Sequence, residues 1–435
     1  MTRREHDALG ERDLPSNVYW GIHTLRAVEN FPITGRPVHP AWRRALAEVK
    51  LAAAMANTEL GLLDHAVGTA IQTAAAEVAE GHLADQFPVD ALQGGAGTSM
   101  NMNMNEVIAN RALEILGIAR GRYDIIHPID HVNRCQSTND TVPTALRVAL
   151  IRLVRALSAE AAELQSALQS KEQEFAGIRK LGRTEMQDAV PMALGQEFGA
   201  WAEAVARDRW RLYKAEERLR QVNLGGTAIG TGVGAERGYA GKALEHLRRI
   251  TGIGLARAEN PIEATQNNDI LVEVSGLLKA CASNLAKLAA DLRLLSSGPR
   301  GGIGEIRLPA LQAGSSIMPG KVNPVMTEMV TQVAYQAMAA DMAVTLGVQA
   351  GQLELNAFLP MIGDNLLTMT EMLTNAMRQL RTRCITGIAA DAERCRENLE
   401  HSTADAAALV PKLGYEAATR LVQERMRAHD GHCNQ

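Results

Sequence analysis

The sequence has 435 residues and a formal net charge of −4, and 46% of it is hydrophobic but only 3% aromatic. This weakly acidic balance excludes the strongly basic surface of a nucleic-acid or membrane-surface binder. The five cysteines are scattered and form no C-x-x-C pair, so we assign no disulfide or zinc site and expect a reduced cytoplasmic protein. The charged N-terminus predicts no secretory signal, and no stretch of about 18 uncharged apolar residues predicts a transmembrane helix.

The first part of the chain alternates between irregular and helical segments. Residues 1–40 are rich in proline, glycine and histidine and are predicted to be irregular. Apolar residues at helical spacing then predict helices over residues 41–61, 67–85 and 101–117. A glycine-rich stretch at 94–97 interrupts this pattern.

Longer helices are predicted from about residue 140 onward. Between Ile270 and Leu295 apolar residues recur mostly at steps of three and four, which is typical of one buried helix face. Similar stripes cover residues 143–173, 191–221, 324–350 and 363–383. Five long helices in a core that is poor in aromatic residues favour a mainly all-α fold with a helical bundle.

Residues 314–324, with the sequence GSSIMPGKVNP, bring several side chains suited to catalysis into one short segment. Pro319 and Pro324 prevent a regular hydrogen-bond ladder, so we expect a polar loop between two helices. Its hydroxyls, lysine and asparagine suit the removal of a proton from the carbon beside a carboxylate and the binding of the resulting anion. The alternative interpretation is a polar surface turn.

This loop resembles the signature of the aspartase/fumarase superfamily, and further matches follow in the same order along almost the whole chain. They are residues 13–15, 21–27, 94–103, 131–133, 136–140, 182–184 and 187–189. GIHTLR at 21–26, QSTND at 136–140 and LQA at 311–313 are nearer to the aspartases than to the fumarases. The chain is therefore identified as a member of this superfamily, on its aspartase side.

The resemblance implies a three-domain fold with a central five-helix bundle that associates into a homotetramer. It implies an N-terminal domain over residues 1–139, the bundle with its catalytic loop at about 312–324 over residues 140–391, and a small third domain over residues 392–435. This third domain looks shortened, with one short helix after the segment 409–416 and a polar tail at 427–432.

The same resemblance implies the reversible elimination of ammonia from L-aspartate to give fumarate through an aci-carboxylate intermediate. It implies no cofactor or metal, a small dicarboxylate substrate, and active sites shared between subunits. Ser315 matches the general base, and Ser316 offers a backbone N–H to the anion. The remaining matches are Thr98, Ser137 and Thr138 for the carboxylate that becomes the aci-form, Lys321 and Asn323 for the other carboxylate, Asn139, Thr184 and Glu185 for the amine, and Glu328 as a supporting residue.

Several of these residues have a purely structural alternative. The hydroxyl residues are also typical helix N-caps, and lysine is most often a solvated surface residue. Position 185 is commonly histidine or glutamine in the family, so Glu185 here is a departure. We hypothesise that its carboxylate selects a positively charged amine, whereas it could also pair with a surface arginine or accommodate an N-substituted aspartate.

Three functions remain open from the sequence. The first is an aspartate ammonia-lyase, and the second is a related lyase that acts on an N-substituted aspartate or on malate. The third is a catalytically silent member that serves as an oligomeric scaffold, because a fold does not guarantee activity. The presence of Ser315, Lys321, Asn323, Thr98 and Thr138 argues against the silent form.

Overall fold

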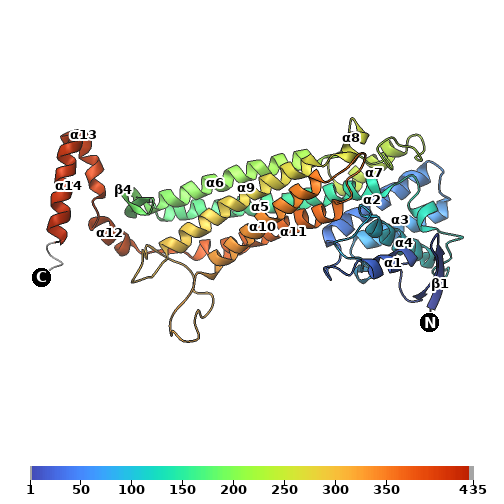
Figure 1. Ribbon diagram of the computed structural model, residues 1–435, viewed down its shortest axis with the longest axis horizontal. Helices are drawn as coiled ribbons and strands as arrows, with labels where there is room; N and C mark the ends of the chain where they lie inside the picture. Colours follow the sequence, from blue (N-terminus) through green and yellow to red (C-terminus); the bar gives the residue numbers. More distant parts are fainter. Residues whose placement is uncertain (1, 431–435) are drawn as a thin grey trace. The chain divides into compact units, whose positions relative to one another are not determined.

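The protein is described from a computed structural model, which covers residues 2–430. The side chains of residues 405, 407 and 425–430 are not described, and residues 431–435, which include Cys433 and the end of the predicted polar tail, lie outside the described part. The chain is mainly α-helical with a few short strands (Figure 1), as the sequence predicted. None of the helices within residues 2–430 combines the length and the apolar character that crossing a membrane requires.

The chain divides into two compact units, each assembled from three stretches of sequence. Unit 1 consists of residues 1–157, 211–279 and 336–372, and unit 2 consists of residues 158–210, 280–335 and 373–435. Five helices of 25 residues or more each have one end in unit 1 and the other end in unit 2. They are α5 (Thr138–Glu174), α6 (Leu194–Leu219), α9 (Asp269–Leu295), α10 (Val325–Gln349) and α11 (Leu359–Arg383).

Unit 1 also contains a group of shorter helices, in which α2 contacts both α3 and α7, and α4 contacts α1 and α3. The ends of these helices follow from local chemistry: Asp64 caps α3 by accepting from the backbone N–H of Ala66 at 2.9 Å, and Gly252 ends α7 with a φ of +67°. Their bounds are α1 (Ile22–Asn30), α2 (Pro40–Glu59), α3 (His65–Ala79), α4 (Thr98–Ile115), α7 (Tyr239–Thr251) and α8 (Pro261–Gln266), with parallel strands β5 (Gln221–Val222) and β6 (Ala256–Arg257).

The first 40 residues correct the prediction of an irregular segment. Strands β1 (Thr2–Asp7) and β2 (Gly10–Pro15) pair antiparallel, and α1 follows them. Gly10 has a φ of +114°, Leu14 is fully buried, and the Arg3 guanidinium donates to the carbonyl of Val18 at 2.6 Å. Such long-range contacts fix a segment whose local sequence shows no periodicity.

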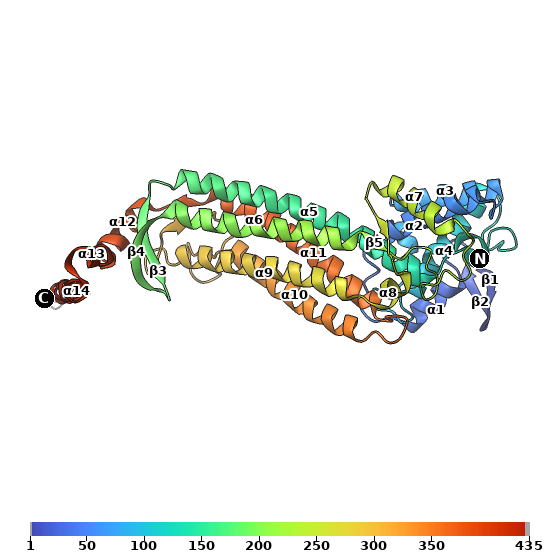
Figure 2. The same cartoon turned by 90° about the horizontal axis from the view of Figure 1, so that it is seen from above.

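Unit 2 contains two small antiparallel sheets and the C-terminal helices. Strands β3 (Arg179–Thr184) and β4 (Gln187–Ala193) form a hairpin, and β3 contacts α12, as Figure 2 shows. Strand β7 (Ile306–Arg307) pairs with β8 (Ala389–Ala390) just before the loop at 314–324. The C-terminal helices are α12 (Ala392–Glu400), α13 (Val410–Leu413) and α14 (Tyr415–Asp430).

Candidate active site

The glycine-rich stretch ends where α4 begins, and it places Thr98 at the first turn of that helix. Gly97 has a φ of +95°, and a Cβ there would lie 2.9 Å from Cγ1 of Val142, so a larger residue would force α4 and α5 apart. The Thr98 hydroxyl is exposed and donates to the carbonyl of Gly95 at 2.7 Å. Its proton is thus directed at Gly95, but the hydroxyl lies at a helix N-terminus, where the macrodipole favours an anion.

The segment Ser137–Thr138–Asn139 forms the start of α5 next to α4. Oγ of Ser137 accepts from the backbone N–H of Asn139 at 3.2 Å, so Ser137 is a helix N-cap, as its structural alternative predicted. Oγ1 of Thr138 accepts from Nδ2 of Asn101 on α4 at 3.1 Å, which leaves its own hydroxyl proton for another acceptor. Nδ2 of Asn139 donates to the carbonyl of Ala228 at 2.8 Å.

A buried cation lies beneath this segment, and sequence analysis did not identify it. Lys50 of α2 is fully buried, and its Nζ donates to Oδ1 of Asn133 and to Oε1 of Gln136, both at 2.9 Å. Burial lowers the pKa of Lys50 to about 7. The same Asn133 oxygen accepts from Asn101 at 3.2 Å, so the network connects Lys50 with the residue that holds Thr138. The signal was a lysine within the apolar run of residues 49–56.

A buried carboxylate holds the backbone of the same segment. Asp140 is fully buried and accepts from the backbone N–H groups of Ser137 at 3.0 Å, Gly225 at 3.1 Å and Thr227 at 3.0 Å. Burial raises the pKa of Asp140 to about 6, and these donors and Lys50 oppose that rise. Asp140 thereby orients Ser137 without facing solvent itself.

In unit 2, Thr184 and Glu185 lie at the tip of the β3–β4 hairpin, and both are exposed. Thr184 pairs with Gln187, so the loop has only two residues, and both have positive φ values, +52° for Glu185 and +62° for Met186. Two positive φ values in a two-residue loop are the requirement of a type I′ turn, which normally takes Asn-Gly. The tip therefore holds Glu185 in a conformation that a non-glycine residue rarely adopts.

The loop at 314–324 is closed at its neck by its own residues. The backbone N–H of Gly314 donates to the carbonyl of Lys321 at 3.0 Å, and Nδ2 of Asn323 donates to the carbonyl of Gly314 at 2.9 Å. Oγ of Ser315 accepts from the backbone N–H groups of Ile317 at 3.2 Å and Met318 at 3.0 Å. Two N–H donors on one hydroxyl oxygen favour its anionic form.

The remaining predicted residues flank this loop. Ser316 and Lys321 are exposed, and Glu328 lies in the first turn of α10. The structure brings four predicted residues together at the adjoining starts of α4 and α5 in unit 1, namely Thr98, Ser137, Thr138 and Asn139. The other seven belong to unit 2: Thr184, Glu185, Ser315, Ser316, Lys321, Asn323 and Glu328.

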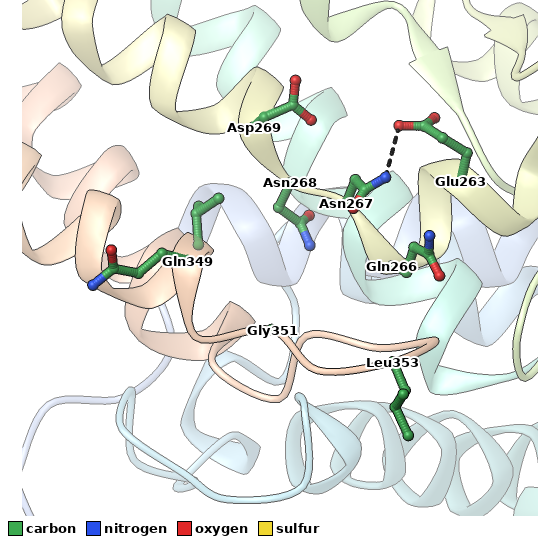
Figure 3. Close-up of a pocket in the computed structure, with 9 residues that line it drawn as sticks. Glu263, Gln266, Asn267, Asn268, Asp269, Gln349, Gly351 and Leu353 are labelled. Atoms are coloured by element: carbon green, nitrogen blue, oxygen red, sulfur yellow. Dashed lines mark hydrogen bonds between the residues drawn. The ribbon is translucent and has the colours of Figure 1, made fainter.

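A separate polar pocket of about 420 Å³ in unit 1 contains none of these residues (Figure 3). It is lined by the end of α8, the start of α9, the end of α10 and the residues that follow it, and Asn267 donates to Glu263 there at 3.3 Å. The side chains of Asp269 and Gln349 point away from each other, so the pocket does not gather its polar groups around one point. Among the side chains that the structure describes, no group of three or more His, Cys, Asp or Glu residues is arranged to hold a metal ion.

The fold is mainly long helices, and the candidate hydroxyl, amide and lysine side chains form one group at the starts of α4 and α5 and another in unit 2. A model of a lyase family matches residues 10–339. The chain is 49% identical to an aspartate ammonia-lyase from a Bacillus species over 422 residues, which cover 97% of this chain and 90% of the relative. The chain belongs to this lyase family.

Solved structures agree with this assignment. A fumarate lyase:delta crystallin from Brucella melitensis, solved with bound cobalt, matches with a TM-score of 0.96 and 51% identity over 99% of this chain and 94% of that one. A class II fumarase from Schistosoma mansoni matches with a TM-score of 0.95 and 33% identity over 99% of this chain and 93% of that one. The fold is therefore the one that these lyases share.

Proposed function

We propose that the protein is a carbon–nitrogen lyase of the aspartate ammonia-lyase type, which converts L-aspartate reversibly into fumarate and ammonia. The observation that carries this proposal is the 49% identity to an aspartate ammonia-lyase over 97% of the chain, because it spans every predicted site residue. Several further curated aspartate ammonia-lyases match at 46–49% identity over almost the whole chain.

The central chemical problem is the acidity of the substrate. The proton that leaves lies on the carbon next to a carboxylate that is already charged, and its loss creates a dianion. The bonding electrons of that C–H bond move into the carboxylate, then form the C=C bond as the C–N bond breaks and ammonia leaves. Donors that already point at the developing charge lower this barrier most effectively.

Ser315 is the base in this proposal. Its alkoxide takes the proton, and the N–H groups of Ile317 and Met318 that already point at Oγ stabilise the alkoxide. The backbone N–H of Ser316 is a further donor to the developing anion. Exposed Lys321 adds a positive charge on the same loop.

Two groups of residues hold the two ends of the substrate. Thr98, Ser137 and Thr138 bind the carboxylate that becomes the aci-form, supported by the N-termini of α4 and α5 and by the hydrogen-bond network that links Lys50, Asn133 and Asn101 to Thr138. Lys321 and Asn323 bind the other carboxylate. The amine contacts Asn139, Thr184 and Glu185, and Glu328 supports them.

We further propose a homotetramer whose active sites combine residues of several subunits, because the predicted residues are divided between two units of the chain. Exposed apolar side chains on the bundle helices support association: Met342 and Leu346, four residues apart on α10, are 61% and 51% exposed. The cysteines at 135, 281, 384 and 395 are buried, and together with their scattered positions in the sequence they support our proposal of a reducing, cytoplasmic environment.

The direct test follows fumarate by ultraviolet absorbance with L-aspartate and L-malate supplied separately. We expect fumarate from aspartate, and we expect Ser315→Ala to lower kcat by at least about 10³-fold because the alkoxide base is gone. Wild-type protein that releases fumarate from malate alone, or from neither compound, would contradict the proposal. In the second case the reverse reaction of fumarate with a panel of amines would test an N-substituted aspartate.

Glu185 provides a test of substrate selection. If its carboxylate attracts the ammonium group, Glu185→Gln should lower kcat/KM for aspartate about tenfold and reduce the preference for aspartate over malate. The measurement compares kcat/KM for both compounds in the variant and the wild type. An unchanged preference would show that Glu185 does not contact the amine.

A further inference from the structure

We propose that Glu305 is a positioning residue, which ties the hairpin that carries Thr184 and Glu185 to the strand that leads into the catalytic loop. This inference rests on the proposed function, because it concerns the placement of the amine-binding tip and of Ser315. Glu305 itself touches no substrate in this proposal.

The Glu305 carboxylate is completely buried and joins three elements of unit 2. Its Oε2 lies 2.9 Å from Nζ of Lys180 on β3, and its Oε1 accepts from NH1 of Arg183 on the same strand at 2.9 Å. Oε1 also accepts from Nδ2 of Asn398 on α12 at 3.0 Å. Oε1 is therefore held by hydrogen bonds to the hairpin and to α12, whereas Oε2 is held by the ion pair with Lys180 alone and has no hydrogen-bond partner.

The two strands held in this way lead directly to the predicted site. Arg183 immediately precedes Thr184 at the tip, and Glu305 immediately precedes β7, after which the chain enters the catalytic loop. The Glu305 backbone is fixed as well, because its N–H donates to the carbonyl of Leu295 at 3.0 Å and its carbonyl accepts from the N–H of Asp391 at 2.9 Å. A shift of the hairpin relative to β7 would have to break the carboxylate contacts.

The positive and negative charges around Glu305 are equal in number, but burying them costs desolvation free energy. Lys180, only 1% exposed, also pairs with Glu197 at 2.6 Å, so two cations face two carboxylates. Burial raises the pKa of Glu197, and the nearby charge of Glu305 raises it further. Apolar residues of similar size would often stabilise a core as well as such a cluster does, whereas ionic hydrogen bonds fix a defined geometry. Because the ionic contacts of Glu305 fix a geometry rather than add stability, we assign Glu305 a positioning role.

The geometry predicts a specific kinetic effect. In Glu305→Gln the amide group that replaces one oxygen faces a cation, so β3 and β7 lose their common anchor. A displacement of about 1 Å between reacting groups costs about 10²-fold in rate, so we expect kcat to fall between about 10-fold and 10²-fold. The KM for aspartate should change less than about threefold, because Thr98, Ser137 and Thr138 of unit 1, which bind one carboxylate in the proposal, lie outside the loosened segments.

The experiment compares Glu305→Gln with Glu160→Gln in the full-length protein. Glu160 is a matched control because it belongs to the same unit and also bridges two cations, Arg378 at 3.1 Å and Arg381 at 3.3 Å, but these lie on α11. For each variant we would measure kcat, KM, thermal stability and amide hydrogen exchange. We expect residues 179–193 and 306–324 to exchange faster together in Glu305→Gln, and not in Glu160→Gln.

Wild-type kcat in a folded Glu305→Gln protein, or faster exchange in only one of the two segments, would overturn the inference. If that variant does not fold, Arg183→Met removes a partner that is 19% exposed and should show the same pattern more weakly. Wild-type kcat and wild-type exchange in Arg183→Met would equally overturn it. Wild-type protein that makes no fumarate would contradict the proposed function, whereas the exchange comparison would still decide whether Glu305 couples the two segments.

Discussion

At the scale of single residues, the chain places ionisable groups where water cannot reach them. Lys50, Glu106, Asp140 and Glu305 are each at most 1% exposed. Each of them has hydrogen-bond partners, which is the condition for burying a charge at tolerable cost, although Oε2 of Glu305 has only its ion pair with Lys180. Asp140 holds the backbone N–H of Ser137, and Lys50 holds the side chains of Asn133 and Gln136 just before it.

Glu106 gives a pH-dependent prediction. Its carboxylate accepts from the backbone N–H groups of Gly21 and His23, both at 2.8 Å, and from the Thr24 hydroxyl at 2.6 Å. Burial, the largest influence, raises the pKa of Glu106 to about 7. Because the folded pKa exceeds that of an unfolded glutamate, the contribution to the free energy of unfolding is complete below about pH 4.5 and is lost as pH rises to about 7.

The size of this loss is about 3 kcal/mol. Glu106→Gln cannot titrate, so the wild type should lose about 3 kcal/mol relative to this variant between about pH 4.5 and pH 8. Denaturant unfolding of both proteins at the two pH values measures the difference. Glu354→Gln, at an exposed glutamate, is the control. Its free energy of unfolding should differ from that of the wild type by the same amount at both pH values. A constant difference for Glu106→Gln would show that Glu106 has an ordinary pKa.

The motifs predict candidate site residues, and these assignments stay predictions, but no motif predicts the residues that support them. The loop serine was assigned from its neighbours in sequence, and the N–H donors on its oxygen come from the same loop. Lys50, in contrast, is separated from residues 133–136 by about 80 positions, so no local pattern connects them. Glu305 likewise acquires its role only when β3 and α12 approach it.

At the scale of elements, long helices were predictable because many apolar residues repeat at one spacing. The helix predicted over 270–295 is α9, Asp269–Leu295, and that predicted over 324–350 is α10, Val325–Gln349. Strands β7 and β8 were missed because each has two residues and they pair across about 80 positions of sequence, whereas β1–β2 and β3–β4 are local hairpins with little apolar alternation. The β3–β4 hairpin also lacks the Asn-Gly dipeptide that would have predicted a two-residue turn from the sequence.

The hairpin turn gives a prediction of stability. Met186 has a φ of +62° and is 68% exposed, so it is strained without being packed. Met186→Gly should raise the free energy of unfolding by about 1 kcal/mol, because relief of strain exceeds the extra entropy of the unfolded chain. Gln187→Gly, in strand β4 and outside the positive-φ region, is the control and should lower stability by about 0.5–1 kcal/mol. A lower melting temperature for Met186→Gly would contradict the type I′ assignment.

At the scale of the whole molecule, the division of the predicted residues between two units determines how activity should depend on assembly. Thr98 belongs to unit 1 and Ser315 to unit 2. If the complete site takes these residues from different subunits, one inactive chain can supply what another lacks. The domain boundaries at residues 139 and 391 remain a prediction from the resemblance.

Mixing two inactive variants tests this arrangement. Thr98→Val and Ser315→Ala, refolded together in equal amounts, should recover up to about a quarter of wild-type activity, since about a quarter of the sites combine both intact residues. Ser315→Ala mixed with Lys321→Ala should recover none, because both changes affect the same loop. Equal activity in the two mixtures would contradict a site shared in this way.

The two-residue turn at Glu185 also limits how the enzyme could be re-engineered for other amines. A saturation library at this position would not sample all amino acids equally, because the backbone there has a φ of +52°. Glycine, asparagine and aspartate tolerate that conformation, whereas valine, isoleucine and threonine would distort the tip before altering its chemistry. Variation of the partner positions on the hairpin, with the turn itself kept short, is therefore the more productive choice for broadening the substrate range.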